Sequence, residues 1–145
     1  MRTAPGLTRL ERKLWRHLVK GMVRAAGAGD DRSVVALYAL MGRALGTSTA
    51  IATVMYLAIQ AAGPWRREAA RRDAFFGFSL TSLDGRELDV DDAPYAVRWA
   101  ARMVSAAVNG DEASLYALAM TARDDGQMDA CVPALARMAA ERAVR

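Results

Sequence analysis

Apolar residues recur every three or four positions through most of the chain, a periodicity typical of amphipathic helices. Thr8 and Glu11 match the capping box S/T-x-x-E and open the first helix. The stripe of this helix that we expect to face a core consists of Leu10, Leu14, Leu18 and Met22. Further caps at Asp30 or Asp31, Ser48, Asp92, Asp111 and Asp129 predict an all-α fold of six main helices, over residues 8–26, 30–44 and 48–62 and then after positions 92, 111 and 129.

The segment between the third and fourth helices departs from this pattern. Trp65–Ala74 predicts a short, very basic helix. Phe78–Thr81 and Glu87–Val90 alternate apolar with polar residues around Asp84-Gly85, a dipeptide typical of hairpin turns. An isolated hairpin is marginal in water, so it would have to pack on the helices or be a loop instead. The alternation favours a small β-hairpin.

An internal repeat relates the two halves of the chain. Displacement by 81 residues aligns 22–37 with 103–118 and gives nine identities in sixteen positions, including Gly29-Asp30 on Gly110-Asp111. A second match, Leu-Tyr-Ala-Leu at 37–40 and 115–118, has a displacement of 78. We therefore predict one domain, residues 1–145, built from two three-helix units, 8–62 and 93–143, joined by a linker, 63–92. Stacking would let the two units bury a shared core.

Composition limits the chemistry that the chain can carry. Of 145 residues, 53% are hydrophobic and 25% charged, as in globular proteins, and 31 are alanine, so helices have to pack closely over small side chains. The single cysteine, Cys131, and the single histidine, His17, exclude an internal disulfide and a Cys/His zinc site. No phosphate-binding loop, nucleophile elbow or metalloprotease motif is present. We expect a non-enzyme without cofactor or metal, placed in the cytoplasm because no signal segment is evident.

Charge is unevenly distributed along the chain. Residues 1–75 hold 13 basic and 5 acidic groups, whereas residues 76–145 hold 7 and 11. One basic cluster falls within about 80° of the first helix, and a second follows Trp65. The candidate binding residues for an anionic partner are Arg9, Lys13, Arg16, Lys20 and Arg24 in the first cluster and Arg66, Arg67, Arg71 and Arg72 in the second. A solvated helix face would explain the same pattern without a partner.

The third helix carries the other candidate surface. Residues 44–65 hold no charge, but the strongly apolar part is only about ten residues long, which is too short to span a bilayer. Apolar residues cover most of the helix, whereas its repeat mate, the sixth helix, carries Arg137 and Glu141 and is expected at the surface. The third helix is therefore the centre of a monomer or the seam of a homodimer. Alanine-rich neighbours cover area poorly, which favours a homodimer through Ile51, Val54, Met55 and Ile59.

Together these features predict a non-catalytic protein–protein interaction module that self-associates and presents a basic helix face to an acidic partner protein. The alternative is a nucleic-acid-binding accessory or regulatory protein that uses the same arginines on phosphates. The acidic second half would repel a duplex, and this places the alternative second.

Overall fold

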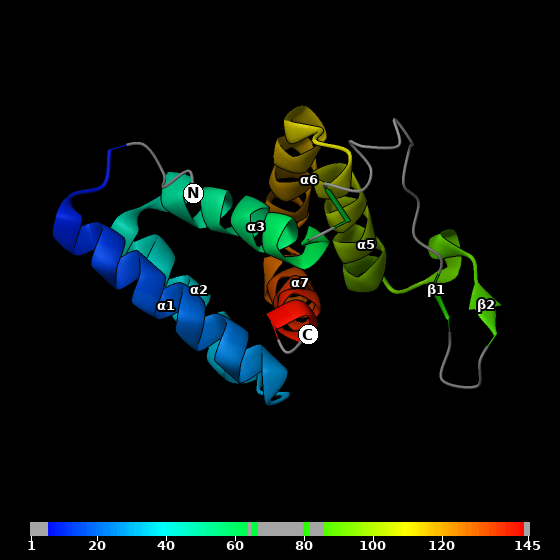
Figure 1. The fold of residues 1–145 in the computed structure, drawn as a ribbon, viewed down its shortest axis with the longest axis horizontal. Coiled ribbons are helices and arrows are strands. Elements are labelled where there is room, and N and C mark those ends of the chain that lie inside the picture. The colour runs from blue at the N-terminus through cyan, green and yellow to red at the C-terminus, as the bar shows by residue number, and fades with distance from the viewer. Residues whose placement is uncertain (1–5, 64, 67–79, 82–85, 144–145) are drawn as a thin grey trace.

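The computed structural model describes residues 6–63, 65–66, 80–81 and 86–143 (Figure 1). In this part of the chain the fold is α-helical. Its six α-helices are α1 (Arg9–Gly27), α2 (Asp31–Leu45), α3 (Thr47–Ala62), α5 (Tyr95–Val108), α6 (Glu112–Asp124) and α7 (Met128–Ala143). None of the described helices is both long enough and apolar enough to cross a membrane.

Several predicted helix caps are present. Thr8 and Glu11 form a reciprocal capping box at the start of α1. Asp30 and Asp111 each accept a hydrogen bond from the backbone N–H three residues later, at the starts of α2 and α6. The cap predictions at Ser48, Asp92 and Asp129 are wrong by one or two residues. The N-caps of α3 and α5 are Gly46 and Pro94, and α7 begins at Met128, so position 129 lies inside that helix.

Three helix ends share one local geometry. After α1, the N–H of Asp30 donates to the carbonyl of Ala25 at 2.9 Å, and Gly29 has φ of 75°. The end of α5 repeats this with Asp111, Ala106 and Gly110 (φ 69°), and the end of α6 with Gln127, Ala122 and Gly126 (φ 68°). This is the Schellman motif, in which a left-handed residue, usually glycine, closes the helix. It reverses the chain within three residues.

The helices form two outer pairs with two helices between them (Figure 1). α1 and α2 pack together on one side of the molecule, and α5 and α6 on the other. α3 and α7 cross between them, in contact with each other. α3 also contacts α2, α5 and α6, while α7 contacts α1, α2, α5 and α6. Each central helix therefore packs against both outer pairs.

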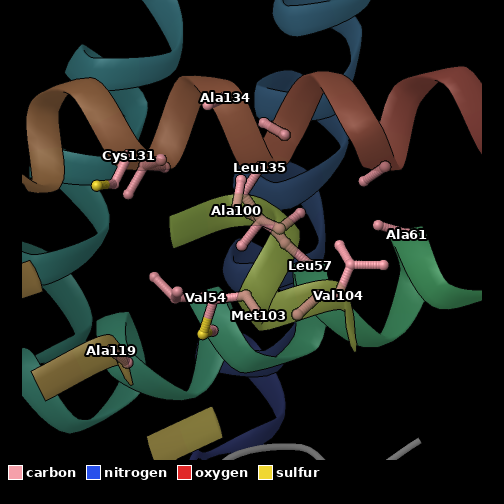
Figure 2. Packing of buried hydrophobic residues seen from close by; sticks show 14 of the residues in the cluster. Val54, Leu57, Ala61, Ala100, Met103, Val104, Ala119, Cys131, Ala134 and Leu135 are labelled. Carbon is pink, nitrogen blue, oxygen red and sulfur yellow. The ribbon is translucent and has the colours of Figure 1, made fainter. Parts of the chain in front are cut away.

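The core lies where α3, α5 and α7 meet (Figure 2). Leu57 of α3, Met103 of α5 and Leu135 of α7 have no exposed surface. The surface placement predicted for the sixth helix is wrong, because most of α7 is buried. Its buried residues include Cys131, Val132, Ala134, Leu135, Ala136, Ala139 and Ala140. The alanines among them let the backbones of neighbouring helices approach closely, so alanine fills this core where larger residues would not fit.

The predicted core stripe of the first helix is only half correct. Leu18 and Met22 are buried, but Leu10 is 76% exposed and Leu14 38% exposed. Trp15 and Val19, between the stripe positions, are buried instead. The buried face of α1 is therefore rotated away from the N-terminal leucines.

The segment before α5 contains β1 (Leu80–Thr81), β2 (Glu87–Leu88) and a 3-10 helix, η1 (Val90–Asp92). The two-residue strands pair antiparallel, with Leu80 opposite Leu88. The strands are shorter than those that the alternation predicted, and the Asp84-Gly85 turn lies outside the described residues. Residues 65–66 are helical. The rest of the predicted basic helix also lies outside the described residues.

Candidate functional site

The basic cluster of the first helix forms one surface on α1, which we call the basic face. Its members are Arg9, Lys13, Arg16, Lys20 and Arg24, and all five are exposed. They lie opposite the buried side of α1, which carries Trp15, Leu18, Val19, Met22 and Ala26. No ion pair joins any of the five to another described residue. At 1.5 Å per residue the row extends for about 22 Å.

Buried contacts hold α1 against α3 beneath this face. The indole N–H of Trp15 donates a 2.8 Å hydrogen bond to the Thr53 hydroxyl, which in turn donates to the Thr49 carbonyl at 2.7 Å. The ring of Trp15 also meets Tyr56 edge to face, with centroids 5.1 Å apart. Thr53 is fully buried. The basic face is thus carried by a helix whose opposite side is fixed.

Three exposed leucines lie beside the basic face. Leu10 and Leu14 are on α1, and Leu40 of α2 is 44% exposed. α1 and α2 come close at Gly21, where an added Cβ would lie 3.1 Å from the Leu37 side chain. Leu14 is two helical turns before Gly21 and Leu40 is one turn after Leu37. Because the helices are antiparallel, these leucines are brought to the same end of the α1–α2 pair. We call Leu10, Leu14 and Leu40 the leucine row.

The sequence predictions missed the leucine row as a surface. A usable signal was present, because the predicted helices 8–26 and 30–44 have 19 and 15 residues, the same lengths as α1 and α2. At 1.5 Å per residue α1 is longer by about 6 Å. The helices are joined by a tight turn at one end, so the excess appears at the N-terminal end of α1, where Leu10 lies.

The second predicted basic cluster lies mostly outside the described residues. Arg66 is half-buried, while Arg67, Arg71 and Arg72 fall in the undescribed part. Nearby, the Arg142 guanidinium lies 4.9 Å from the centre of the Trp65 ring, a cation–π contact between α7 and the segment after α3. The structure therefore gives this cluster no geometry as a site.

The residues predicted for self-association lie at different depths in α3. Ile51 is 6% exposed and Val54 is fully buried. Met55 and Ile59 are half-buried and pack against the core. A second chain could reach only Met55 and Ile59 without opening the fold.

Two open grooves accompany these surfaces. One, of about 430 Å³, lies between α5 and α6 and is lined by Arg102, Asn109, Asp111 and Thr121 among others. The other, of about 380 Å³, is lined by Tyr38, Arg43, Ile51, Arg123 and Met128 and lies where α2 and α3 meet the α6–α7 turn. Tyr38 donates to the Ala50 carbonyl, and burial raises the pKa of its hydroxyl to about 12. This phenol stays protonated at neutral pH and acts as a packing group with one hydrogen bond.

Nucleophilic and metal-binding groups do not converge in the described part of the chain. Cys131 is fully buried, and burial raises the pKa of its thiol to about 11, whereas His17 is exposed on α1. Tyr95 donates to the Asp125 carboxylate at 2.7 Å, and this bond raises the pKa of the Tyr95 hydroxyl to about 12. No group of three or more His, Cys, Asp or Glu side chains is placed to hold a metal among the described residues.

Comparison of the chain with protein-family models, with curated proteins and with solved structures finds no match.

Proposed function

We propose that the protein is a non-catalytic interaction module that binds an acidic partner protein through the basic face of α1. One observation carries the proposal. Five cations are exposed along a single helix face and have no ion pair with any other described residue. A partner's carboxylates could pair with this row without breaking an ion pair among the described residues, and a row of like charges on one helix face steers an oppositely charged partner to that face.

The second candidate is nucleic-acid binding through the same cations. The spacing along α1 suits a row of phosphates as well as a row of carboxylates. The exposed acidic residues of the second half argue against a duplex, which would be repelled wherever it extended beyond α1. These residues include Asp111, Asp124, Asp125 and Asp129.

A binding assay separates the two candidates. The probes are a fluorescent Glu-rich peptide and a short DNA duplex, each titrated with the protein at low and rising salt. We expect the peptide to bind and the double variant R16E/K20E to weaken binding about tenfold. R43E/R123E is the matched control, because it reverses two exposed cations that lie on α2 and α6 rather than on α1. Tighter binding of the duplex, with a log–log salt slope of about 0.9 per phosphate, would favour the nucleic-acid function. Binding of neither probe at low salt would refute both.

We also propose that the two units, 8–62 and 93–143, are copies of one ancestral unit. Three helix boundaries in the first unit have counterparts 81 positions later: Gly27 and Val108, Asp31 and Glu112, and Thr47 and Met128. The Schellman turns before α2 and α6 match residue by residue. Superposition of the two units in a crystal structure tests this. Unrelated helix crossing angles would contradict it.

A difference between the units is consistent with divergence after duplication. Gly21 of α1 aligns with Arg102 of α5. At Gly21 the helices α1 and α2 approach closely around Leu37, whereas Arg102 lines the groove between α5 and α6. A large side chain in place of glycine holds a helix pair apart. The duplicated pair thus has room for a groove in the second unit.

Self-association through α3 and a cytoplasmic location stay predictions. The partial exposure of Met55 and Ile59 supports the first, while the burial of Val54 limits the area that a second chain could cover. Light scattering at micromolar concentration is the direct measurement. A mass of 15.7 kDa would exclude the homodimer.

A further inference from the structure

Apolar and basic side chains meet on the outer side of the α1–α2 pair. Leu10 and Leu14 are one turn apart, and Lys13 of the basic face lies about 60° from Leu10 around α1, with Lys20 about 20° farther. His17 lies between the two sets and is exposed. Leu40 adds an exposed apolar side chain from α2. Cations therefore border the leucine row along α1.

The leucine row is not a remnant of the core. The core side of α1 is already occupied by the contacts of Trp15 and Met22 with the rest of the fold. Leu10 and Leu14 lie on the side of α1 that carries Gly21, two to three turns before the close approach of α2 to that glycine. A side chain that is 76% exposed, as Leu10 is, gains almost nothing from folding. These leucines are available to a partner.

We propose that the partner element is an amphipathic helix with an apolar stripe and acidic flanks, which packs across the outer side of the α1–α2 pair against the leucine row. This inference rests on the proposed function, since it specifies which acidic surface the basic face binds. An amphipathic helix presents its apolar stripe through anchors at i, i+3 or i+4 and i+7. The leucine row would receive these anchors, and the cations of α1 would pair with the carboxylates beside them.

Charge distinguishes this occupant from a second copy of the chain. Two α1 helices facing each other would bring ten cations together, and like charges at close range oppose association. A bilayer is also a poor fit. Interfacial helices insert a large apolar face, whereas the large apolar face of α1 is buried in the protein core and only the leucines at its N-terminal end remain.

The test uses two peptides of identical composition, built from Leu, Glu and Ala. In the first, leucines follow the i, i+3, i+4, i+7 pattern. In the second, they are distributed around the helix, so net charge is matched and the apolar stripe is lost. We expect the first peptide to bind the full chain at least tenfold more tightly. The double variant L10Q/L14Q should lower its affinity to that of the second peptide, without changing helix content by circular dichroism.

Two controls make the outcomes distinct. Tyr116→Gln removes a comparably exposed apolar side chain on α6 and should leave both affinities unchanged. Lys20→Glu should weaken both peptides. If both peptides bind equally and L10Q/L14Q has no effect while Lys20→Glu does, this inference is overturned and the proposed function stands. If neither peptide binds at low salt, both are overturned. Leucine-dependent binding to phosphatidylserine vesicles without peptide binding would identify a membrane surface instead and overturn both.

Discussion

Replacement of Thr53 by valine tests how α1 is fixed to α3. Valine keeps the shape of threonine and removes only the hydroxyl, which accepts the 2.8 Å hydrogen bond from the Trp15 indole. Thr53 is fully buried and Trp15 is 4% exposed, so water cannot replace the lost acceptor. The Thr49 carbonyl, to which the hydroxyl donates, lies inside the helix and keeps its backbone bond. The cost is therefore the unsatisfied indole N–H.

An unsatisfied buried donor costs about 1–3 kcal/mol, and the additional apolar burial of valine offsets a few tenths. We expect Thr53→Val to lower the free energy of unfolding by about 1–2 kcal/mol and Tm by about 2–6 °C. Urea unfolding followed by circular dichroism measures this. Thr53→Ser, which keeps the hydroxyl, is the control for the loss of packing.

A double-mutant cycle with Trp15→Phe isolates the bond. If Trp15 and Thr53 interact as described, the double variant should be more stable than the two single losses predict, by about 1 kcal/mol. A Thr53→Val variant as stable as the wild type, or a coupling energy near zero, would show that the hydroxyl does not hold the indole.

Three further predictions concern the core and the helix caps. Because burial raises the pKa of the Cys131 thiol to about 11, the native protein should not react with a disulfide reagent at pH 8, while the protein unfolded in guanidinium should react fully; fast native labelling would contradict the burial. Val54→Asp places a carboxylate in the fully buried interior and should unfold the chain, because an unpaired buried charge costs several kcal/mol. Gln60→Glu, at an exposed position of the same helix, is the control. If circular dichroism showed that the Val54→Asp variant is folded, Val54 would not lie in a monomer core. Asp30 accepts hydrogen bonds from Ser33, and Asp111 from Ser114; in each pair the side-chain bond has the larger effect and the backbone bond the smaller, and both lower the pKa of the carboxyl below the usual 3.8. The two carboxylates therefore stabilise the fold above pH 4, and this stabilisation is lost as the pH falls through the lower folded-state pKa. D30N/D111N, which keeps the caps but cannot titrate there, should show a smaller fall in Tm between pH 5 and pH 2, and an unchanged fall would count against this linkage.

Local signals predicted the helices well. Asp30 is a short-range cap that needs only the next three residues to act, so its role could be inferred from the sequence. Gly29 likewise ends α1 through contacts within six residues. Starts without a side-chain cap were harder to predict. At α3 the helix begins after Gly46 with no capping side chain, and Ser48, the nearest suitable residue, drew the predicted start inward.

The candidate surface was predicted in charge but not in shape. Lys20 and its basic neighbours repeat with helical spacing, and long charged side chains are stable only where water reaches them. Leu10 could not be placed in this way, because its burial depends on whether another helix extends that far. The same limit applies to α7. Ala136 and Ala139 are small enough to be buried between helices or exposed to water, and only the tertiary packing decides which.

The position of α7 also affects how the chain folds while it is being synthesised. α7 closes the packing of α1 and α2, and Arg137 pairs with Asp31, 106 positions away in sequence. At ribosomal rates of 5–20 residues per second, α7 is synthesised about 3–13 s after α3. During that interval the first three helices lack the helix that covers them, and the apolar sides of α1 and α3 are open to other nascent chains. An α7 from a neighbouring chain presents the same surface, so crowded synthesis on one message favours exchange of this helix between two copies.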